Sequence, residues 1–315
     1  LGLSLGISTS LLILLWVGDE KMMDNFHTNA PNLFTIFERQ YHDGIVEARH
    51  NTPGPLAAEL KQVFPEVKYA TGMSWDELQT FEGNNKILKQ QGAYASPDFF
   101  SVFSYPLIAG EAENAVKTTI DIAISRKMAE TFFGGPGEAM GKTLRFSNKK
   151  DLKVSGVFEN VPVYSSRKFD YILNWDTFYE EHSWAANWGN NAPATHIVLQ
   201  EGTDLRAFEQ KIEKFIEKYH KEENFIIRLA LQKHSDLYLH SNFKDGELAG
   251  GRIQYVNIFT AVAVFVLLIA CINFMNLTSA RSITRAKEIG VRKVIGALRG
   301  ALIRQFMGEA LLIVS

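Results

Sequence analysis

Residues 253–280 form a 28-residue stretch that contains no Asp, Glu, Lys, Arg or His. Its most apolar part, residues 259–277, would extend over roughly 28 Å as an α-helix, because each helical residue advances the chain by about 1.5 Å. That length matches the hydrocarbon core of a bilayer, which is about 30 Å thick. A buried helix of a soluble protein rarely runs this far without a charge. The sequence therefore predicts a membrane-spanning helix here.

The basic residues that follow predict the orientation of this helix. Seven Lys or Arg residues lie between Arg281 and Arg304, and Glu288 is the one acidic residue among them. An excess of basic residues beside a spanning helix marks the cytoplasmic side. Residues 281–305 are therefore expected in the cytoplasm, and the long region before the helix is expected on the other side of the membrane.

That long region is acidic. Residues 1–252 carry 26 Lys and Arg against 33 Asp and Glu, a net charge of −7, whereas the remainder carries 7 against 2, a net charge of +5. A nucleic-acid partner is not expected, because the large region lacks a strongly basic balance. Cys271 is the single cysteine, so no disulfide within the chain can stabilise the region and its own apolar core must do so.

Both ends of the chain lie in apolar segments. Residues 1–17 lack the basic start and the small-residue cleavage site of a signal peptide. They are expected to form most of a first spanning helix whose cytoplasmic start is missing. Residues 306–315 are expected to open a third spanning helix that is also cut, so we expect the chain to be a fragment.

Between the two spanning helices, strand-like and helix-like patterns alternate, which predicts an α+β extracytoplasmic domain between transmembrane α-helices. The clearest helix is capped by Thr203 or Asp204 and carries one apolar stripe from Leu205 to Tyr219. Strands are predicted at residues 33–41, 67–73, 86–93, 120–124, 143–146, 152–158, 196–199 and 224–232, and helices at residues 55–64, 98–103, 126–133 and 205–219.

No catalytic, metal-binding or cofactor-binding residue is predicted. The loop from Gly134 to Thr143 lacks the first glycine of a phosphate-binding loop, and a helix precedes it where that motif needs a strand. His220, His234 and His240 do not have the spacing of a metal site and are expected on the surface or in strands. The aromatic-rich residues 175–188 could contact a ligand, but packing within the domain is favoured. We therefore expect a chain that is not an enzyme.

Asn273 and Asn276 are polar residues of the second spanning helix. Amides at this depth face protein or the membrane interface more often than lipid, so both residues are predicted to pack against another helix. Gly2 and Gly6 form a small-xxx-small pair that would permit close packing in the first helix.

The strongest local pattern covers residues 284–299. Val291, Val294 and Ile295 fall on one helical face, while Glu288 and Arg292 have the spacing of an i,i+4 ion pair. Gly290 and Gly296 weaken a helix by about 1 kcal/mol each and so predict breaks between short helices. Taken alone, the segment could also be a basic helix that rests on anionic lipid.

Residues 285–297, with the sequence Arg-Ala-Lys-Glu-Ile-Gly-Val-Arg-Lys-Val-Ile-Gly-Ala, resemble the FtsX/MacB-like permease family of ATP-binding-cassette (ABC) transporters. Residues 303–306 and 309–312 continue the resemblance. Residues 270–281 are similar to the second membrane helix of that family, and residues 16–27 to the entry of its periplasmic core domain. The resemblance extends over nearly the whole chain.

The resemblance implies a permease subunit of the bacterial cytoplasmic membrane that crosses it several times. A cytoplasmic ABC ATPase would bind the ATP, and a second permease unit would complete a dimer or form the other half of a longer chain. The substrate would be an antimicrobial, a peptide or a lipoprotein that the transporter exports or extracts. The ectodomain would have two lobes, one inserted into the other. The residues implied at the ATPase-coupling interface are Glu288, Gly290, Arg292, Lys293 and Gly296.

The expected organisation starts with transmembrane helix 1 at residues 1–17 and an extracytoplasmic core domain at 18–250, with an inserted lobe at about 96–195. Transmembrane helix 2 follows at 251–280, the coupling segment at 281–305 and the start of helix 3 at 306–315. The main alternative is a two-helix membrane sensor with an extracytoplasmic ligand-binding domain. Such a sensor would continue a heptad pattern into the cytoplasm, and Gly290 and Gly296 argue against that pattern.

Overall fold

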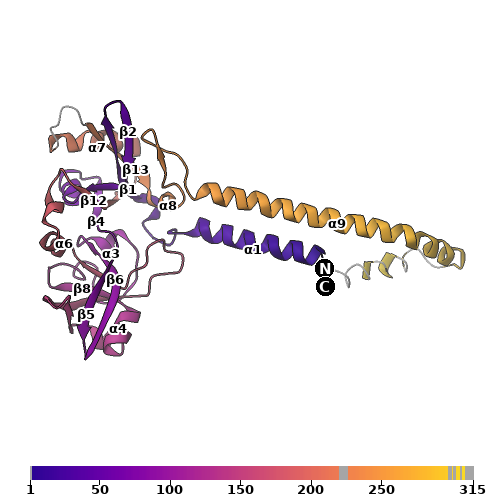
Figure 1. Ribbon diagram of the computed structural model, residues 1–315, viewed down its shortest axis with the longest axis horizontal. Coiled ribbons are helices and arrows are strands. Elements are labelled where there is room, and N and C mark those ends of the chain that lie inside the picture. Colours follow the sequence, from indigo (N-terminus) through magenta and orange to yellow (C-terminus); the bar gives the residue numbers. More distant parts are fainter. Residues whose placement is uncertain (1, 220–225, 297–299, 301–302, 306, 309–315) are drawn as a thin grey trace. The chain divides into compact units, whose positions relative to one another are not determined.

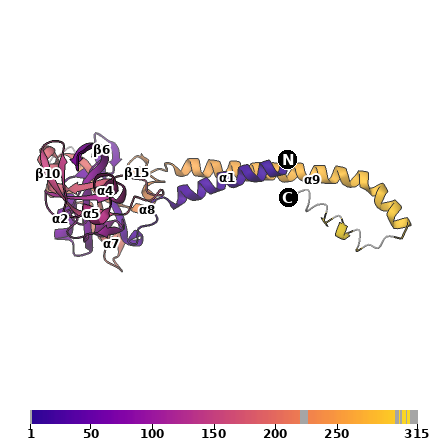
Figure 2. The same ribbon diagram turned by 90° about the horizontal axis from the view of Figure 1, so that it is seen from below.

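A computed structural model describes the chain except for residues 1, 220–225, 297–299, 301–302, 306 and 309–315. The chain forms two compact units, one of residues 1–21 with 253–315 and one of residues 22–252. We call the second unit the large domain. The first unit is built on two long helices, α1 (Gly2–Met22) and α9 (Ile253–Val294), which run side by side and which we call the helix pair (Figures 1 and 2). Residues 2–22 and 253–280 are long and apolar enough to cross a membrane.

Six strands of the large domain pair in a closed ring. Each strand bonds to the next in the order β6, β11, β8, β10, β9 and β5, and β5 returns to β6 through an antiparallel hairpin. The ring lies in the lower part of the domain in Figure 1. Its strands are β5 (Glu77–Gly83), β6 (Lys86–Ala95), β8 (Asp121–Ser125), β9 (Thr143–Phe146), β10 (Lys150–Phe158) and β11 (Tyr171–Asn174).

Three short helices share an apolar core with the ring, and residues such as Phe81, Phe132 and Phe178 are fully buried in it. Ser125 caps the first of these helices by accepting a hydrogen bond from the N–H of Met128, and Gly134, at φ +96°, ends it. The helices are α4 (Arg126–Phe133), α5 (Pro136–Ala139) and α6 (Trp175–Glu181).

The rest of the large domain is an antiparallel sheet in the order β4–β12–β1–β13, and β2 and β3 pair with β1 and β12. The helices at residues 56–63 and 205–213 and the helical turn at residues 215–218 pack on one face of this sheet. There Leu60, Phe208 and Ile212 are buried in the same apolar cluster as Ile36. These elements are β1 (Leu33–His42), β2 (Ile45–Arg49), β3 (Asn51–Pro53), α2 (Leu56–Val63), β4 (Val67–Met73), β12 (Asn191–Leu199), α7 (Leu205–Glu213), the 3₁₀ turn η3 (Phe215–Lys218) and β13 (Ile226–Lys233).

The ring and the antiparallel sheet are joined by one pair of bridged strand residues and by a shared apolar core. Met73 of β4 pairs with Ala95 of β6. Around this junction Leu33 and Val198 of the sheet are buried in the same cluster as Ile172 of the ring. The cluster also takes in α3 (Phe99–Val102), next to β7 (Leu107–Ala109). The remaining elements are η1 (Ala30–Asn32), η2 (Ser183–Ala186), α8 (His234–Leu237), β14 (Phe243–Lys244) and β15 (Glu247–Leu248).

Most predicted elements of the large domain are confirmed, and the strand at residues 67–73 and the helix at 126–133 have the predicted bounds. The prediction of one helix from Leu205 to Tyr219 is wrong. Asp204 caps it as expected, but α7 ends at Glu213 and the chain continues as a 3₁₀ turn. The tighter turn places Tyr219 flat against Trp188, with ring centroids 3.7 Å apart, so tertiary packing outweighs the helical pattern.

The predicted helix break at Gly290 is also wrong. The helix continues through Gly290 to Val294, and Gly296, at φ +93°, follows its end. A glycine inside a helix costs only about 1 kcal/mol relative to alanine, so favourable neighbours on both sides can maintain the helix. The prediction of a third spanning helix falls on residues 306–315, most of which lie outside the described residues.

Candidate functional site

Small residues recur at every fourth position on the side of α1 that faces α9. A Cβ atom added to Gly6 would lie 2.4 Å from Cβ of Ala270, and the hydroxyl of Ser10 donates a hydrogen bond to the carbonyl of Ala263 at 2.9 Å. Because later residues of α1 contact earlier residues of α9, the two helices are antiparallel. Small side chains let the two backbones approach closely, which is how membrane helices associate.

The two asparagines predicted to pack in the helix pair differ in their surroundings. A Cβ atom at Gly2 would lie 2.9 Å from Nδ2 of Asn273, so the amide of Asn273 lies against the backbone of α1. The side chains of Asn273 and Asn276 are both exposed. Of the two, the structure therefore brings Asn273 against the partner helix.

Aromatic residues cluster at one end of the helix pair, near the end of α1 and the start of α9, where the chain connects to the large domain. Trp16 packs edge-on against Phe259 with ring centroids 5.1 Å apart, and Tyr255 is 63% exposed. Trp and Tyr are enriched at the level of the lipid headgroups, where an apolar ring with a polar group is favoured. These residues indicate where the pair leaves the hydrocarbon.

The candidate coupling segment begins as a direct continuation of α9. Fourteen helical residues follow Ala280 and end at Val294, a length of roughly 21 Å. Val291 and Val294 of α9 and Ile295, which directly follows the helix, form an exposed face, and a Cβ atom added to Gly290 would meet nothing within 4 Å. This face is therefore apolar and open on the part of the chain that the structure describes.

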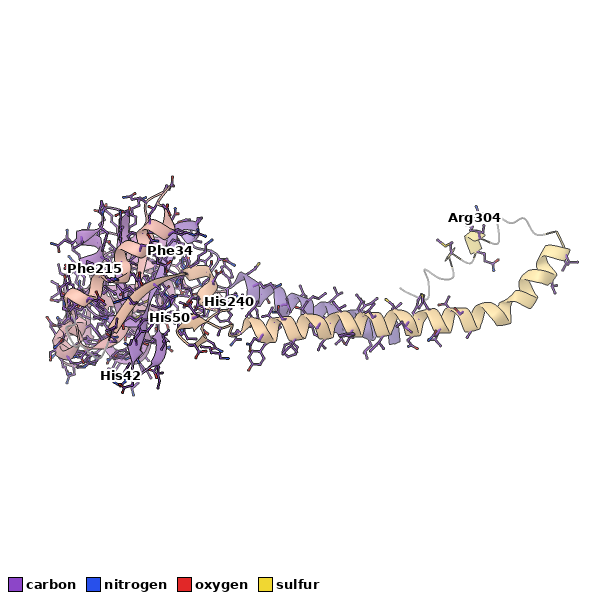
Figure 3. All side chains as sticks on the ribbon, turned by 90° about the horizontal axis from the view of Figure 1, so that it is seen from above. Phe34, His42, His50, Phe215, His240 and Arg304 are labelled. Carbon is purple, nitrogen blue, oxygen red and sulfur yellow. The ribbon has the colours of Figure 1, made fainter. Side chains whose placement is uncertain are left out.

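The backbones of Glu288, Arg292 and Lys293 belong to α9, but their side chains lie outside the described residues. Gly296 lies just beyond the helix. Figure 3 shows Arg304 on the short helical stretch that follows. The predicted coupling residues are thus grouped at one end of α9 by their backbone positions.

A buried histidine cluster in the large domain is a feature that the sequence did not reveal. The hydroxyl of Thr35 lies 3.0 Å from Nδ1 of His196 and 3.1 Å from Nδ1 of His234, so it can donate to one ring and accept from the other. His27 packs beside His234 with ring centroids 5.6 Å apart, and its Nδ1 accepts a hydrogen bond from the N–H of Ser104 at 3.1 Å. The expectation that His234 is a surface or strand histidine is wrong, since it is buried in α8.

Burial lowers the pKa of each histidine in this cluster. Desolvation, assisted by nearby positive groups, lowers the pKa of His27 and of His234 to about 4, and the pKa of His196 falls well below its usual range. Two neutral rings at the hydroxyl of Thr35, with the ring of His27 beside one of them, could suggest a metal site. Among the described residues, however, no group of three His, Cys, Asp or Glu side chains is arranged to hold a metal ion.

Glu38 is a buried carboxyl group on the neighbouring part of β1. Its Oε2 accepts hydrogen bonds from Nε2 of Gln40, at 2.9 Å, and from Nδ2 of Asn191. Its Oε1 has no hydrogen-bond partner among the described residues. Desolvation by burial raises the pKa of Glu38 to about 7 despite these bonds, because burial disfavours the charged form.

The aromatic residues at 175–188 mainly pack inside the domain. Trp175 and Phe178 are buried in the core of the ring, and Trp188 stacks on Tyr219. Trp184 is 42% exposed and lies parallel to Trp75, which is 40% exposed. Packing within the domain therefore accounts for most of this stretch.

Two helices long and apolar enough to cross a membrane, on either side of a large mixed α/β domain in the sequence, are the features of a membrane protein. The chain belongs to the MacB-like periplasmic core domain family, whose sequence model matches residues 1–215. The sequence model of the FtsX-like permease C-terminal family matches residues 260–315. The predicted family is thus confirmed, and the two matches support a permease component of an ABC transporter.

Known proteins similar to this chain agree with that assignment. The macrolide export ATP-binding/permease protein MacB of Neisseria gonorrhoeae is 22% identical over 322 residues, covering 99% of this chain and 47% of the relative. MacB of Sodalis glossinidius is 25% identical over 228 residues, covering 68% of this chain and 32% of the relative. The chain thus spans about half, or less, of the length of these relatives.

Solved structures are similar in fold. A domain of a protein assigned as a permease from Porphyromonas gingivalis has a TM-score of 0.56 and 20% sequence identity, covering 66% of this chain and 91% of that domain. The periplasmic region of MacB from Actinobacillus actinomycetemcomitans has a TM-score of 0.43 and 16% identity, covering 63% and 88% of the two chains. The first of these supports the observed fold of the large domain.

Proposed function

We propose that this chain is the permease subunit of an ABC transporter in the bacterial cytoplasmic membrane, and that it transmits ATP-driven motion to its periplasmic domain. A separate or fused cytoplasmic ATPase binds and hydrolyses the ATP. The moving domain exports or extracts a substrate such as an antimicrobial, a peptide or a lipoprotein. The MacB relatives are named for macrolide export, which supports the first of these classes.

The observation that carries this proposal is the continuity of α9. The helix has 42 residues from Ile253, the first residue after the large domain, to Val294, a length of roughly 63 Å. A hydrogen-bonded helix resists bending where no proline or inserted group interrupts it. A displacement applied near Gly290 would therefore reach the start of α9 instead of being absorbed on the way.

The end of this helix near Gly290 would carry the surface that docks on the ATPase. Glu288, Arg292, Lys293 and the two glycines, Gly290 and Gly296, dock on the ATPase. The exposed Val291, Val294 and Ile295 give this surface an apolar part that water would otherwise cover. Charged residues around such a patch would fix the register of the partner.

The complete permease crosses the membrane several times and works with a second permease unit, either as a dimer or as the other half of a longer chain. Its periplasmic domain acts as two lobes, the ring of six strands and the antiparallel sheet, joined at Met73 and Ala95. The inserted lobe predicted at residues 96–195 leaves out β5 and β6, which pair within the ring. ATP-driven motion would change the relative positions of the two lobes at this junction.

A two-helix sensor would also use a continuous helix after its ligand-binding domain. Gly290 does not separate the two functions, because α9 passes through that residue without a break. The match of residues 260–315 to the FtsX-like permease model favours the permease. A sensor would bind no ATPase, so the following experiment distinguishes the two.

Reversing two charges at the proposed docking surface tests the function. The double variant Arg292→Glu, Lys293→Glu should lose most co-purification with its ABC ATPase and most permease-dependent ATP hydrolysis, because like charges at an interface repel. The large domain should keep its trypsin-digestion pattern. The matched control is Lys89→Glu, Lys142→Glu, which makes the same charge change at two exposed residues of the large domain. Normal ATPase binding by the 292/293 variant would refute the docking assignment.

A further inference from the structure

The loop at residues 162–166 exposes apolar surface on the large domain. Val163 is 87% exposed and Tyr164 is 40% exposed, although residues on both sides of them are partly or fully buried. An isolated exposed valine is common on protein surfaces. This one is unusual in its attachment, because its loop is bonded to the residues that directly follow a membrane helix.

Asp24 attaches the loop to the end of α1. Its backbone N–H donates a hydrogen bond to the carbonyl of Tyr164 at 2.9 Å, and its Oδ1 accepts one from the N–H of Ser166 at 2.8 Å. Asp24 is buried and has φ +58°, a conformation that Asp adopts more readily than most residues. The ring of Phe26 packs edge-on against Tyr164 with centroids 5.5 Å apart. The loop is thus fixed at three points to residues 24–26.

This attachment limits how far the loop can lie from the membrane, however the large domain is oriented. Asp24 follows Met22, the last residue of α1, by two positions. Two residues extend over at most about 7 Å, so with one hydrogen bond the carbonyl of Tyr164 lies within roughly 10 Å of the end of the helix.

The end of α1 itself lies near the lipid headgroups. The apolar run of α1 ends at Val17, next to Trp16, and Met22 is the fifth helical residue after Val17, a length of roughly 8 Å. The headgroup layer on each side of a bilayer has a thickness of roughly 5–8 Å. Met22 therefore lies at about the outer surface of that layer, within reach of the loop.

We propose that Val163 and Tyr164 contact the lipid headgroup region of the membrane that α1 spans, and so form a third membrane contact beside the two helices. The valine side chain gains from leaving water, and tyrosine is favoured at this depth because its ring is apolar and its hydroxyl is polar. Lys168 supports the loop from behind, since its ammonium group donates to the carbonyl of Val163 at 2.9 Å and also to that of Pro162. The positive charge of Lys168 suits a surface of lipid phosphates.

Depth-sensitive fluorescence tests this contact in the full chain reconstituted into phosphatidylcholine–phosphatidylglycerol vesicles. The variant Val163→Cys is made in a Cys271→Ala background, because Cys271 is the single native cysteine. The introduced thiol carries an environment-sensitive NBD label. The control label is at Ile87→Cys, where the side chain is 67% exposed but its strand is not bonded to residues 24–26. Lipids with a nitroxide on the headgroup serve as the quencher.

The label at residue 163 should be quenched at least about threefold more strongly than the label at residue 87, because only the first lies at headgroup depth. Adding Asp24→Gly, which allows the positive φ but removes the acceptor of Ser166, should reduce this quenching. Equal quenching at residues 163 and 87 would overturn the proposal. So would disulfide-linked dimers of the unlabelled Val163→Cys protein without lipid quenching, because the loop would then contact a second copy of the chain.

Discussion

Glu38 and Thr35 lie on the same strand, β1, and both bring polar chemistry into the interior of the large domain. Glu38 is held by Gln40 and Asn191, and Thr35 by two histidines. Isolated buried polar groups destabilise a fold unless they are hydrogen-bonded, and buried ionisable groups shift their pKa towards the neutral form. Glu38 and the histidines beside Thr35 should therefore make the stability of this domain depend on pH.

The first prediction concerns Glu38→Gln. The pKa of Glu38 is about 7 in the folded domain and about 4.5 when unfolded, so the folded state binds more protons between these values. Stability contributed by the protonated carboxyl is present below pH 4.5 and is lost as the pH rises through 7, by up to about 3 kcal/mol. Glutamine mimics the protonated group. The variant should be more stable than the parent at pH 8 in denaturant titrations followed by tryptophan fluorescence, and equally stable at pH 5.

A variant that is no more stable than the parent at pH 8 would contradict this assignment of Glu38. Glu47→Gln is the matched control, because Glu47 is exposed on the adjacent strand β2. That substitution removes one carboxylate without changing a buried group. It should shift the denaturation midpoint little at either pH.

The histidine cluster predicts the opposite dependence. His27 and His234 have a pKa of about 4 in the folded domain, below the value of about 6.5 in the unfolded chain, so the unfolded state binds more protons in between. Stability should therefore fall as the pH drops from 6.5 towards 4, by up to about 3 kcal/mol for each histidine. Arg167 is a positive group that acts on His234, and Asp24 is a negative group that acts on His27.

Replacing His234 by glutamine removes one of these titrating groups and keeps a hydrogen-bonding side chain beside Thr35. The variant should lose less stability than the parent between pH 6.5 and pH 5 in the same denaturant titrations. His42→Gln, at an exposed histidine at the end of β1, is the control. Identical pH slopes for the parent and the His234 variant would show that the cluster does not titrate as proposed.

At the scale of the elements, the helix pair depends on the absence of a side chain at Gly6. A Cβ atom there would lie 2.4 Å from Cβ of Ala270, whereas one at Gly18, in the same helix, would meet nothing within 4 Å. Forcing extra atoms into such a contact typically costs about 1–3 kcal/mol. The pair should therefore separate when Gly6 is enlarged and remain intact when Gly18 is enlarged.

Thiol cross-linking measures this separation. Ser10→Cys and Ala263→Cys replace two residues that are in contact across the pair, in a Cys271→Ala background. Adding Gly6→Leu should reduce the cross-linking yield several-fold, and adding Gly18→Leu should leave it unchanged. If both leucine variants cross-link equally well, the small-residue face is not what holds the helices together.

The elements also show what local sequence can predict and what it cannot. The strand β4 and the helix α4 follow from their residue patterns, and Asp204 was one of two predicted caps. β5 was missed because its seven residues include several polar ones, although the following Asn84-Asn85 turn, with φ values of 49° and 60°, is typical of a hairpin. β11 was missed because four residues are too few for a periodic pattern.

At the scale of the whole molecule, the sequence predicts the mixed α/β character of the large domain, the two apolar helices and the family, and all three are confirmed. The closed ring could not be predicted, because its parallel pairing of Tyr171 with Gly92 joins residues far apart in the sequence. The buried histidines were missed for the same reason, since His27, His196 and His234 meet only through tertiary packing. The proposed coupling residues come from the family resemblance, and the structure adds that Glu288, Gly290, Arg292 and Lys293 lie on the same helix as the apolar stretch at residues 253–280.

The unbroken course of α9 also limits how such a chain can change in length. Each residue inserted between Ala280 and Val294 would advance the far end by about 1.5 Å and turn it by about 100° around the axis. One insertion would thus rotate the exposed valines away from their partner. Seven insertions would nearly restore their direction, because seven residues make close to two turns. If the segment docks on a partner as proposed, functional relatives should therefore differ in its length by numbers that keep this direction, such as roughly seven or eleven residues.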